Sequence, residues 1–310
     1  MSTKTLNITN GDSLNDRLLK LDITGDFAVW REMLCEGKTT YIIGDQDFVN
    51  TRKAFLETDY AIDTFDYEEK FGSQLEIIKK WKEYDEIILW FEYDLFCHIN
   101  MMACISYMVQ LYCNKPLFLV CSGRVDGEKN LMGISELTDK QLDNHYQNKQ
   151  VLTGNDLILA DKIWRLYCSD DHVPLQPKLA KDSNFIYLSN CISAHKKRFP
   201  EEHSGLNTLE RHLLKLIKKH KISSEHQLCG YVLNYQGYYG NGDMQVLKMI
   251  KRLRSYFEEQ DGYFIVNEKG EYALAGNDIQ APGQNETCYF GGVSKYAYQY
   301  HEETHQLIKI

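Results

Sequence analysis

The sequence lacks the glycine-rich fingerprints of the commonest nucleotide-binding folds, since neither G-x-G-x-x-G nor G-x-x-x-x-G-K-[ST] occurs in it. The first residues, Met1 to Thr5, also lack the charged region, apolar run and cleavage site of a signal peptide. The most apolar stretch, Leu95 to Tyr112, contains polar residues such as His98 and Asn100, which favours a buried helix over a membrane span. We therefore expect a cytoplasmic protein with no membrane partner.

The nine cysteines contain no C-x-x-C pair, are scattered and are odd in number. Reduced cysteines, several of them in core segments, are the simplest interpretation, and a structural zinc site is not indicated. The 310 residues are 43% hydrophobic and 25% charged, which excludes a disordered chain and allows two domains.

The net negative charge of −9 comes from the first part of the chain. Residues 1–181 carry 20 basic and 29 acidic side chains, whereas residues 182–310 carry 15 of each. Because contacts to phosphates require Lys and Arg, a nucleic-acid role would have to rest on the second part.

The first part alternates between predicted strands and helices. The predicted strands are Lys4 to Thr9, Phe27 to Trp30, Ile87 to Phe91 and Leu117 to Cys121. Between and after them, helical spacing covers Asp47 to Thr58, Glu68 to Tyr84, Leu95 to Cys113 and much of Thr138 to Tyr167. This pattern predicts an α/β domain over residues 1–181, with a mostly parallel, Rossmann-like sheet and helices on both faces.

The second part predicts a smaller domain. A helical linker, 182–204, precedes a winged-helix-like outline over 205–278. That outline consists of helices from about Leu209, over Ser223 to Leu233 and over Met244 to Phe257, followed by strands at Tyr263 to Val266 and Tyr272 to Leu274. The alternating, tyrosine-rich tail over 285–310 predicts a final β-hairpin.

Two acids, Glu92 and Asp94, follow the most apolar predicted strand and precede the most apolar predicted helix. Open α/β sheets bind ligands at such carboxyl ends. The two carboxylates therefore either cap the helix or carry chemistry, and the metal requirement stays open.

The turn after the first strand, Asn10-Gly11-Asp12-Ser13, can offer backbone N–H groups to an anion. With Leu14 it spells G-D-S-L, the block that carries the nucleophilic serine of an esterase family, which makes Ser13 a hydrolase candidate. The other blocks of that family are incomplete here, because Gly154-Asn155-Asp156 lacks one residue. A helix cap formed by Asp12 or Ser13 is the alternative.

Two further residues follow the second strand, Arg31 and Glu36. Arg31 has paired donors that suit a phosphate or carboxylate, although an ion pair with a neighbouring acid is an equal alternative.

The histidines give one candidate. His98 lies one helical turn from Asp94, and a carboxylate that orients an imidazole is a general-base arrangement. His145, His172, His195 and His203 have no ligand-like spacing and are interpreted as surface residues.

The third helix of the winged-helix outline carries basic side chains. They are Lys248, Lys251, Arg252 and Arg254. Such a helix commonly reads the DNA major groove, so contact with DNA is an alternative function. Basic residues near a helix carboxyl end are also ordinary partners of its dipole, and packing against protein is the favoured interpretation.

The chain resembles a bacterial family known only as domain of unknown function 1835. The resemblance rests on Thr9 to Ser13, Val29 to Glu32 with Glu36-Gly37, and Leu89 to Leu95, followed by shorter matches as far as Gly291-Gly292. It implies one shared site formed by Asp12, Arg31, Glu36, Glu92 and Asp94, with no established activity. The family commonly has His at position 93 and Gln at position 98, so the resemblance does not extend to a base formed by Asp94 and His98.

Together these features predict that the protein binds a small phosphorylated or nucleotide-like ligand at the carboxyl edge of the sheet. Candidate ligand-binding residues are Asn10, Gly11, Asp12, Ser13, Arg31 and Glu36, and candidate catalytic residues are Glu92, Asp94 and His98. Whether the protein is an enzyme, and which cofactor it uses, stays open.

Overall fold

The centre of the molecule is a five-stranded sheet. The computed structural model describes residues 3–21, 23–277, 281–283 and 287–310. The strands lie in the order β2 (Asp26–Val29), β1 (Thr5–Thr9), β4 (Glu86–Phe91), β5 (Leu117–Cys121) and β6 (Gln150–Val151). The first four are parallel, and β6 is antiparallel to β5. The predicted α/β class with a mostly parallel sheet is therefore confirmed.

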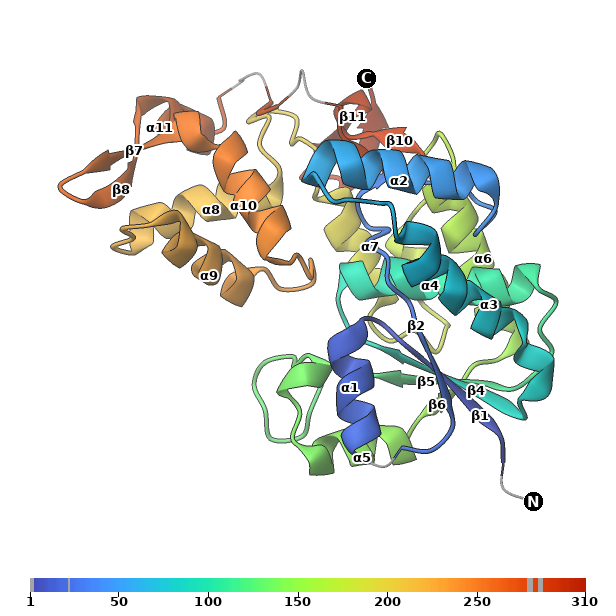
Figure 1. The fold of residues 1–310 in the computed structure, drawn as a ribbon. Coiled ribbons are helices and arrows are strands. Elements are labelled where there is room, and N and C mark those ends of the chain that lie inside the picture. The colour runs from blue at the N-terminus through green and yellow to red at the C-terminus, as the bar shows by residue number, and fades with distance from the viewer. Residues whose placement is uncertain (1–2, 22, 278–280, 284–286) are drawn as a thin grey trace.

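Helices cover both faces of this sheet (Figure 1). One face carries α1 (Asp12–Lys20) and α5 (Asp139–Gln147), whereas the other carries α3 (Ser73–Lys79), α4 (Leu95–Gln110), α6 (Gly154–Cys168) and α7 (Leu188–Lys196). Because both faces are covered, β4 is continuously apolar after Glu86, with the sequence Ile-Ile-Leu-Trp-Phe, and these five residues are buried.

The strand order reverses between β1 and β4. The chain passes from β1 to β2 on one side and then returns to place β4 on the other side of β1. At such a switch point the two connections leave in opposite directions, which opens a crevice beyond the carboxyl ends of the strands. Asn10 to Ser13 follow β1 and Glu92 follows β4 at this point.

The helix α2 (Gln46–Tyr60) confirms its prediction, but the segment predicted as one helix over Glu68 to Tyr84 is divided. It consists of a π-helical turn (Glu68–Gly72), α3 and a 3-10 turn (Trp81–Glu83). The predicted linker also contains α7, which buries Leu188, Cys191 and Ile192 in the main core.

A helical unit over residues 208–274 projects from one side of the α/β domain (Figure 1). It contains α8 (Thr208–Lys219), α9 (Glu225–Tyr235), α10 (Asp243–Arg252), the hairpin β7 (Phe257–Gln260) with β8 (Tyr263–Val266), and α11 (Glu268–Leu274). The strand predicted at Tyr272 to Leu274 is wrong. Asn267 accepts a hydrogen bond from the backbone N–H of Gly270 and so starts a helix there.

The tail returns to the α/β domain. Its strand β9 (Tyr289–Gly291) pairs in parallel with β3 (Gly37–Lys38) and antiparallel with β10 (Val293–Ser294). The strands β11 (Tyr298–His301) and β12 (Gln306–Lys309) form the predicted hairpin. The predicted boundary at 285 lies outside the described residues. Among the helices of the described ranges, none is long and apolar enough to cross a membrane.

Candidate functional site

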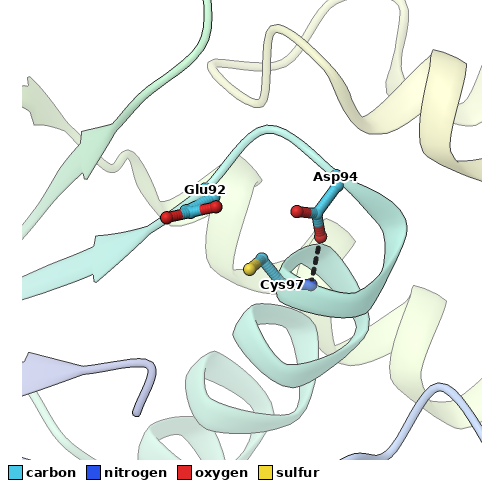
Figure 2. A group of neighbouring side chains, drawn as sticks. All are labelled: Glu92, Asp94 and Cys97. Carbon is cyan, nitrogen blue, oxygen red and sulfur yellow. Dashed lines mark hydrogen bonds between the residues drawn. The ribbon is translucent and has the colours of Figure 1, made fainter. Parts of the chain in front are cut away.

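The two carboxylates beyond β4 have different roles (Figure 2). Asp94 is the N-cap of α4, and its Oδ1 accepts a hydrogen bond of 2.8 Å from the backbone N–H of Cys97. The Glu92 Oε1 atom accepts one of 2.9 Å from the N–H of Ile134, which follows β5 along the chain. Of the two roles predicted for these acids, Asp94 therefore has the structural one, as a helix cap. Glu92 does not cap α4.

Burial shifts the proton equilibrium of both acids. Burial, together with the nearby charge of Asp94, raises the pKa of Glu92 to about 7. Burial also raises the pKa of Asp94, although the N–H of Cys97 partly offsets this effect. Glu92 therefore changes its charge close to neutral pH, as a general acid or base must.

A loop of the helical unit closes over Asp94. The Leu95 N–H donates a hydrogen bond of 2.8 Å to the carbonyl oxygen of Tyr238. Gly240, at φ +67°, approaches so closely that a Cβ there would lie 2.2 Å from the Asp94 carboxyl carbon. The helical unit is therefore part of the wall of this site.

Glu92, Asp94 and Cys97 are also the residues here that could hold a metal ion. One ligand atom of each lies within 4.8 Å of the others. The Asp94 carboxylate is already engaged as a helix cap, and the Cys97 Sγ accepts a hydrogen bond of 3.0 Å from Asn10 Nδ2. Burial raises the pKa of the Cys97 thiol, which opposes the thiolate form that a metal requires.

His98 lies in the first turn of α4, and its exposed fraction is 0%. Its Nδ1 lies 2.9 Å from the backbone oxygen of Asp94, and its Nε2 has no partner among the described residues. The predicted pairing of His98 with the Asp94 carboxylate is therefore wrong, because that carboxylate turns to the helix N–H groups. Burial lowers the pKa of His98 to about 4, so the ring is neutral.

His98 lines a cavity of about 830 Å³, which we call the carboxyl-edge cavity. The short β6 pairs only with Phe118 and Leu119 of β5, and the cavity lies where β6 leaves the rest of β5 open. Its lining comes from the end of β5 with the loop after it, from α5, and from the segment before α7. The members used below are His98, Cys121, Arg124, Lys140, Phe185 and Tyr187.

Tyr187 forms an aromatic wall of this cavity. Its ring contacts His98 and Tyr93 edge to face, with centroids 6.5 Å and 6.1 Å away. Its hydroxyl accepts a hydrogen bond of 2.7 Å from the Arg124 N–H. The exposed side chains of Arg124 and Lys140 add positive charge at the rim.

The turn after β1 reaches the same edge of the sheet. Asn10 accepts a hydrogen bond of 2.9 Å from Asn100 Nδ2 and donates to Cys97, which ties this turn to α4. Gly11, at φ +97°, precedes α1 with no side-chain cap, and space beside its Cα is open. Ser13 is exposed, and within the described ranges no histidine is bonded to it, so the hydrolase alternative lacks its base.

Arg31 forms the ion pair that its alternative interpretation predicts. Its Nε and Nη2 donate to the carboxylate of Asp12 at 2.9 Å and 2.7 Å, and its Nη1 donates to the Lys70 carbonyl oxygen. Asp12 and Arg31 are therefore together, as predicted.

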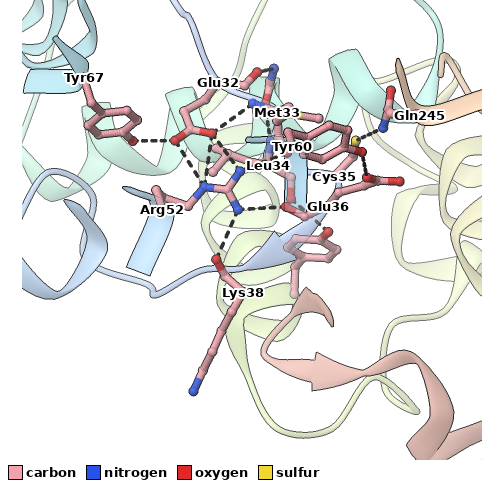
Figure 3. A network of polar contacts seen from close by, with 12 residues as sticks. Glu32, Met33, Leu34, Cys35, Glu36, Lys38, Arg52, Tyr60, Tyr67 and Gln245 are labelled. Carbon is pink, nitrogen blue, oxygen red and sulfur yellow. Dashed lines mark hydrogen bonds and ion pairs between the residues drawn. The ribbon is translucent and has the colours of Figure 1, made fainter. Parts of the chain in front are cut away.

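Glu36 lies elsewhere, in a polar network between α2 and the residues before β3 (Figure 3). Its carboxylate accepts a hydrogen bond from the Tyr60 hydroxyl and pairs with Arg198 at 3.6 Å. In the described part of the chain no bond joins Glu36 to Glu92 or Asp94. The prediction of one cleft shared by all five charged residues is wrong, because the chain after β2 turns away to meet α2.

Sequence reasoning missed the centre of this network, Arg52. Its guanidinium is fully buried and pairs with Glu32 at 2.9 Å, and it also donates to the carbonyl oxygens of Met33, Glu36 and Lys38. One signal was present, since Arg52 falls at helical spacing between Phe48 and Phe55 on the buried face of α2.

The four basic residues predicted along the third helix do not form one exposed face, and Arg254 lies in the 3-10 turn (Arg254–Tyr256) after α10. Lys248 pairs with Asp59 of α2 at 2.5 Å, and Arg252 pairs with the buried Glu210 of α8 at 3.4 Å. Lys251 is exposed, and Arg254 donates to the Phe257 carbonyl oxygen. The geometry that DNA reading requires is absent, because α10 faces the α/β domain.

Two histidines predicted at the surface are buried, so that prediction is wrong. His172 Nδ1 lies 3.0 Å from His195 Nε2, and His172 Nε2 lies 2.8 Å from the Tyr167 carbonyl oxygen. Both rings have exposed fractions of 0% and lie among Phe199, Phe290 and Tyr167.

Comparison of the chain with protein-family models and with curated proteins gives no match.

Proposed function

We propose that the protein binds a small phosphorylated or nucleotide-like ligand in the carboxyl-edge cavity. The observation that carries the proposal is the Nε2 atom of His98. A backbone oxygen only accepts hydrogen bonds, so Nδ1 holds the proton of the neutral ring and Nε2 presents a lone pair. A buried acceptor without a partner is unfavourable, and an N–H or O–H group of a ligand would satisfy it.

The other surroundings of the cavity indicate the class of ligand. Phe185 and Tyr187 offer aromatic surface to a flat ring, and Arg124 with Lys140 can receive a phosphate at the rim. The neighbouring switch point between β1 and β4 is where α/β sheets of this type bind nucleotides. A ligand whose ring donates a hydrogen bond to His98 and whose phosphate lies at the rim is a nucleoside phosphate.

Glu92 supports turnover of that ligand as part of the same proposal. Its pKa of about 7 allows it to take up or release a proton at neutral pH, and it lies beside the end of β5 that the cavity uses. Membership of the family with domain of unknown function 1835 is likewise proposed, on the residues quoted above.

The proposal is tested by calorimetric titration of the protein with AMP, adenosine and ribose 5-phosphate. We expect AMP to bind most tightly, and His98→Phe to weaken its binding by roughly fivefold to tenfold, since one hydrogen bond contributes about 1–1.5 kcal/mol. The matched control is His226→Phe on the exposed surface of α9, which should bind as the wild type does.

The rim is tested separately with the double variant Arg124→Gln, Lys140→Gln. It should weaken AMP binding and reduce its salt dependence, but leave adenosine binding unchanged. Wild-type affinity for AMP in His98→Phe, or no binding of any of the three compounds, would contradict the proposed function.

A further inference from the structure

The buried side chain of Lys196 has no acidic partner. Within the described ranges four Lys and Arg residues are buried, and the other three pair with a carboxylate: Arg52 with Glu32, Arg198 with Glu36, and Lys295 with Glu210. Lys196 is only 2% exposed and forms no ion pair in this part of the chain. A buried ammonium group is normally paired with an opposite charge, so Lys196 is the exception.

The hydrogen bonds of Lys196 go to neutral groups. Its Nζ donates to the side-chain oxygen of Gln176 at 2.9 Å and to the carbonyl oxygen of His305. Burial lowers the pKa of Lys196, and a bound anion would oppose this effect. The surroundings of this side chain are therefore polar, but they do not balance its charge.

Lys196 lines a cavity of about 340 Å³, which we call the lysine pocket. Its walls are the start of the 3-10 turn Pro177–Ala180, the end of α7, and β11 with the turn that leads into β12. This volume lies at the lower end of the range for small-molecule sites, about 300–1,000 Å³.

Positive charge around the lysine pocket is not balanced by acids. Lys178 and Lys197 also line it, and neither forms an ion pair in the described part of the chain. Among the described residues that line the pocket, none is Asp or Glu. The carbonyl end of α7 favours cations, but it supplies only roughly half a negative charge. Three lysines therefore meet at one cavity, in a protein whose net charge is −9.

We propose that the lysine pocket binds a small molecule with two linked phosphate groups. Lysine binds phosphate as a point charge, whereas the paired donors that suit a carboxylate belong to arginine, which does not line this pocket among the described residues. A phosphate group carries about −1.5 to −2 charges at neutral pH, so two such groups balance three lysines. The ligand replaces the carboxylate that Lys196 lacks.

The test is calorimetric titration of the full chain with inorganic diphosphate, inorganic phosphate and citrate, without divalent cations and at constant ionic strength. We expect diphosphate to bind most tightly. Lys196→Met should weaken its binding by at least roughly tenfold, as expected for the loss of a charged hydrogen bond. Lys162→Gln is the matched control, because Lys162 is exposed on α6 away from the pocket and should have no effect.

A second variant keeps the test informative should Lys196→Met fail to fold. Neither Lys178 nor Lys197 is buried, so the double variant Lys178→Gln, Lys197→Gln should fold. It should weaken diphosphate binding and its salt dependence. Diphosphate should raise the melting temperature of the wild type, and raise that of this variant less.

Two further measurements separate the lysine pocket from the carboxyl-edge cavity and identify the source of the phosphates. The double variant Arg124→Gln, Lys140→Gln should bind diphosphate as the wild type does. In that variant, tighter binding of ADP than of diphosphate would assign the pocket to a nucleotide, and equal binding would assign it to inorganic diphosphate.

Three results would overturn the proposal. Citrate that binds as tightly as diphosphate would show an attraction of charge alone and overturn the phosphate assignment. Equal affinity for phosphate and diphosphate would overturn the second phosphate group. No binding of diphosphate, or unchanged binding in both lysine variants, would overturn the site.

Discussion

Two regions of this protein bury charged and polar groups in opposite ways. At the carboxyl-edge cavity burial lowers the pKa of His98 and raises that of Glu92, so both tend toward their uncharged forms. Between α8 and the tail, Glu210 is even more deeply buried than Glu92, yet its pKa is lowered because Lys295 and Arg252 lie beside it. Desolvation acts at both places, and the presence of an opposite charge decides which form persists.

The largest loss of stability should come from removing one member of a buried ion pair. Arg52→Met leaves the Glu32 carboxylate buried and unpaired, which should cost about 3–5 kcal/mol of the free energy of unfolding. Urea denaturation at pH 7 measures this loss.

Two variants serve as controls for that measurement. Arg165→Met removes a pair with Asp161 whose Arg side chain is 60% exposed, and should change stability by less than about 1 kcal/mol. The double variant Arg52→Met, Glu32→Leu should recover part of the loss. A single variant as stable as the wild type would show that this region does not depend on paired charge.

The next effect concerns His172 and His195, which stay neutral because they are buried and lie beside cations. Burial lowers the pKa of His172 to about 4, and burial with the charges of His172, Arg198 and Lys196 lowers that of His195. The unfolded chain takes up these protons below about pH 6.5, so stability should fall as the pH decreases from there toward 4. His172 alone should account for roughly 2 kcal/mol at pH 5.

Urea denaturation between pH 7 and pH 4.5 checks this dependence. His172→Gln should be less stable at pH 7 but should lose less stability on acidification than the wild type does. Parallel profiles for the two proteins would show that the histidine pair is not the source of the acid sensitivity.

The smallest effects distinguish the two acids after β4. Asp94→Ala removes the cap of α4 and should cost about 0.5–2 kcal/mol at pH 7. Glu92→Gln should act in the opposite direction. Because the folded pKa of Glu92, about 7, lies above its usual value of 4.5, the fold loses stability as the pH rises from about 4.5 to 7. The substitution should raise the melting temperature at pH 8 and leave it almost unchanged at pH 4.

Local sequence patterns predicted the elements that form the sheet edge. The apolar run of β4 and the apolar helix after it placed Glu92 and Asp94 correctly at a strand end and a helix start. The prediction of a strand at Tyr272 was wrong for a local reason. Asn267 caps a helix there, and this outweighs the β-propensity of the residues after it.

The partners of buried polar residues could not be predicted in this way. His172 and His195 are 23 residues apart, and nothing in their spacing shows that Tyr167 and Phe199 enclose them. Glu36 was placed by strand order alone, whereas its position depends on Arg52 and Tyr60 of another helix. Such contacts are set by tertiary packing, which periodicity does not encode.

The pairing of β3 with β9 has a consequence for how this chain is made. Gly37 and Lys38 find their strand partners only at Phe290 and Gly291, some 250 positions later. During synthesis, which proceeds from the amino end at roughly 5–20 residues per second, that edge stays open for more than ten seconds. Throughout this time a nascent chain displays an unpaired strand to its neighbours, and a tail strand from another copy could fill it. Exchange of tails between copies is thus the characteristic misassembly to look for when this protein is produced at high concentration.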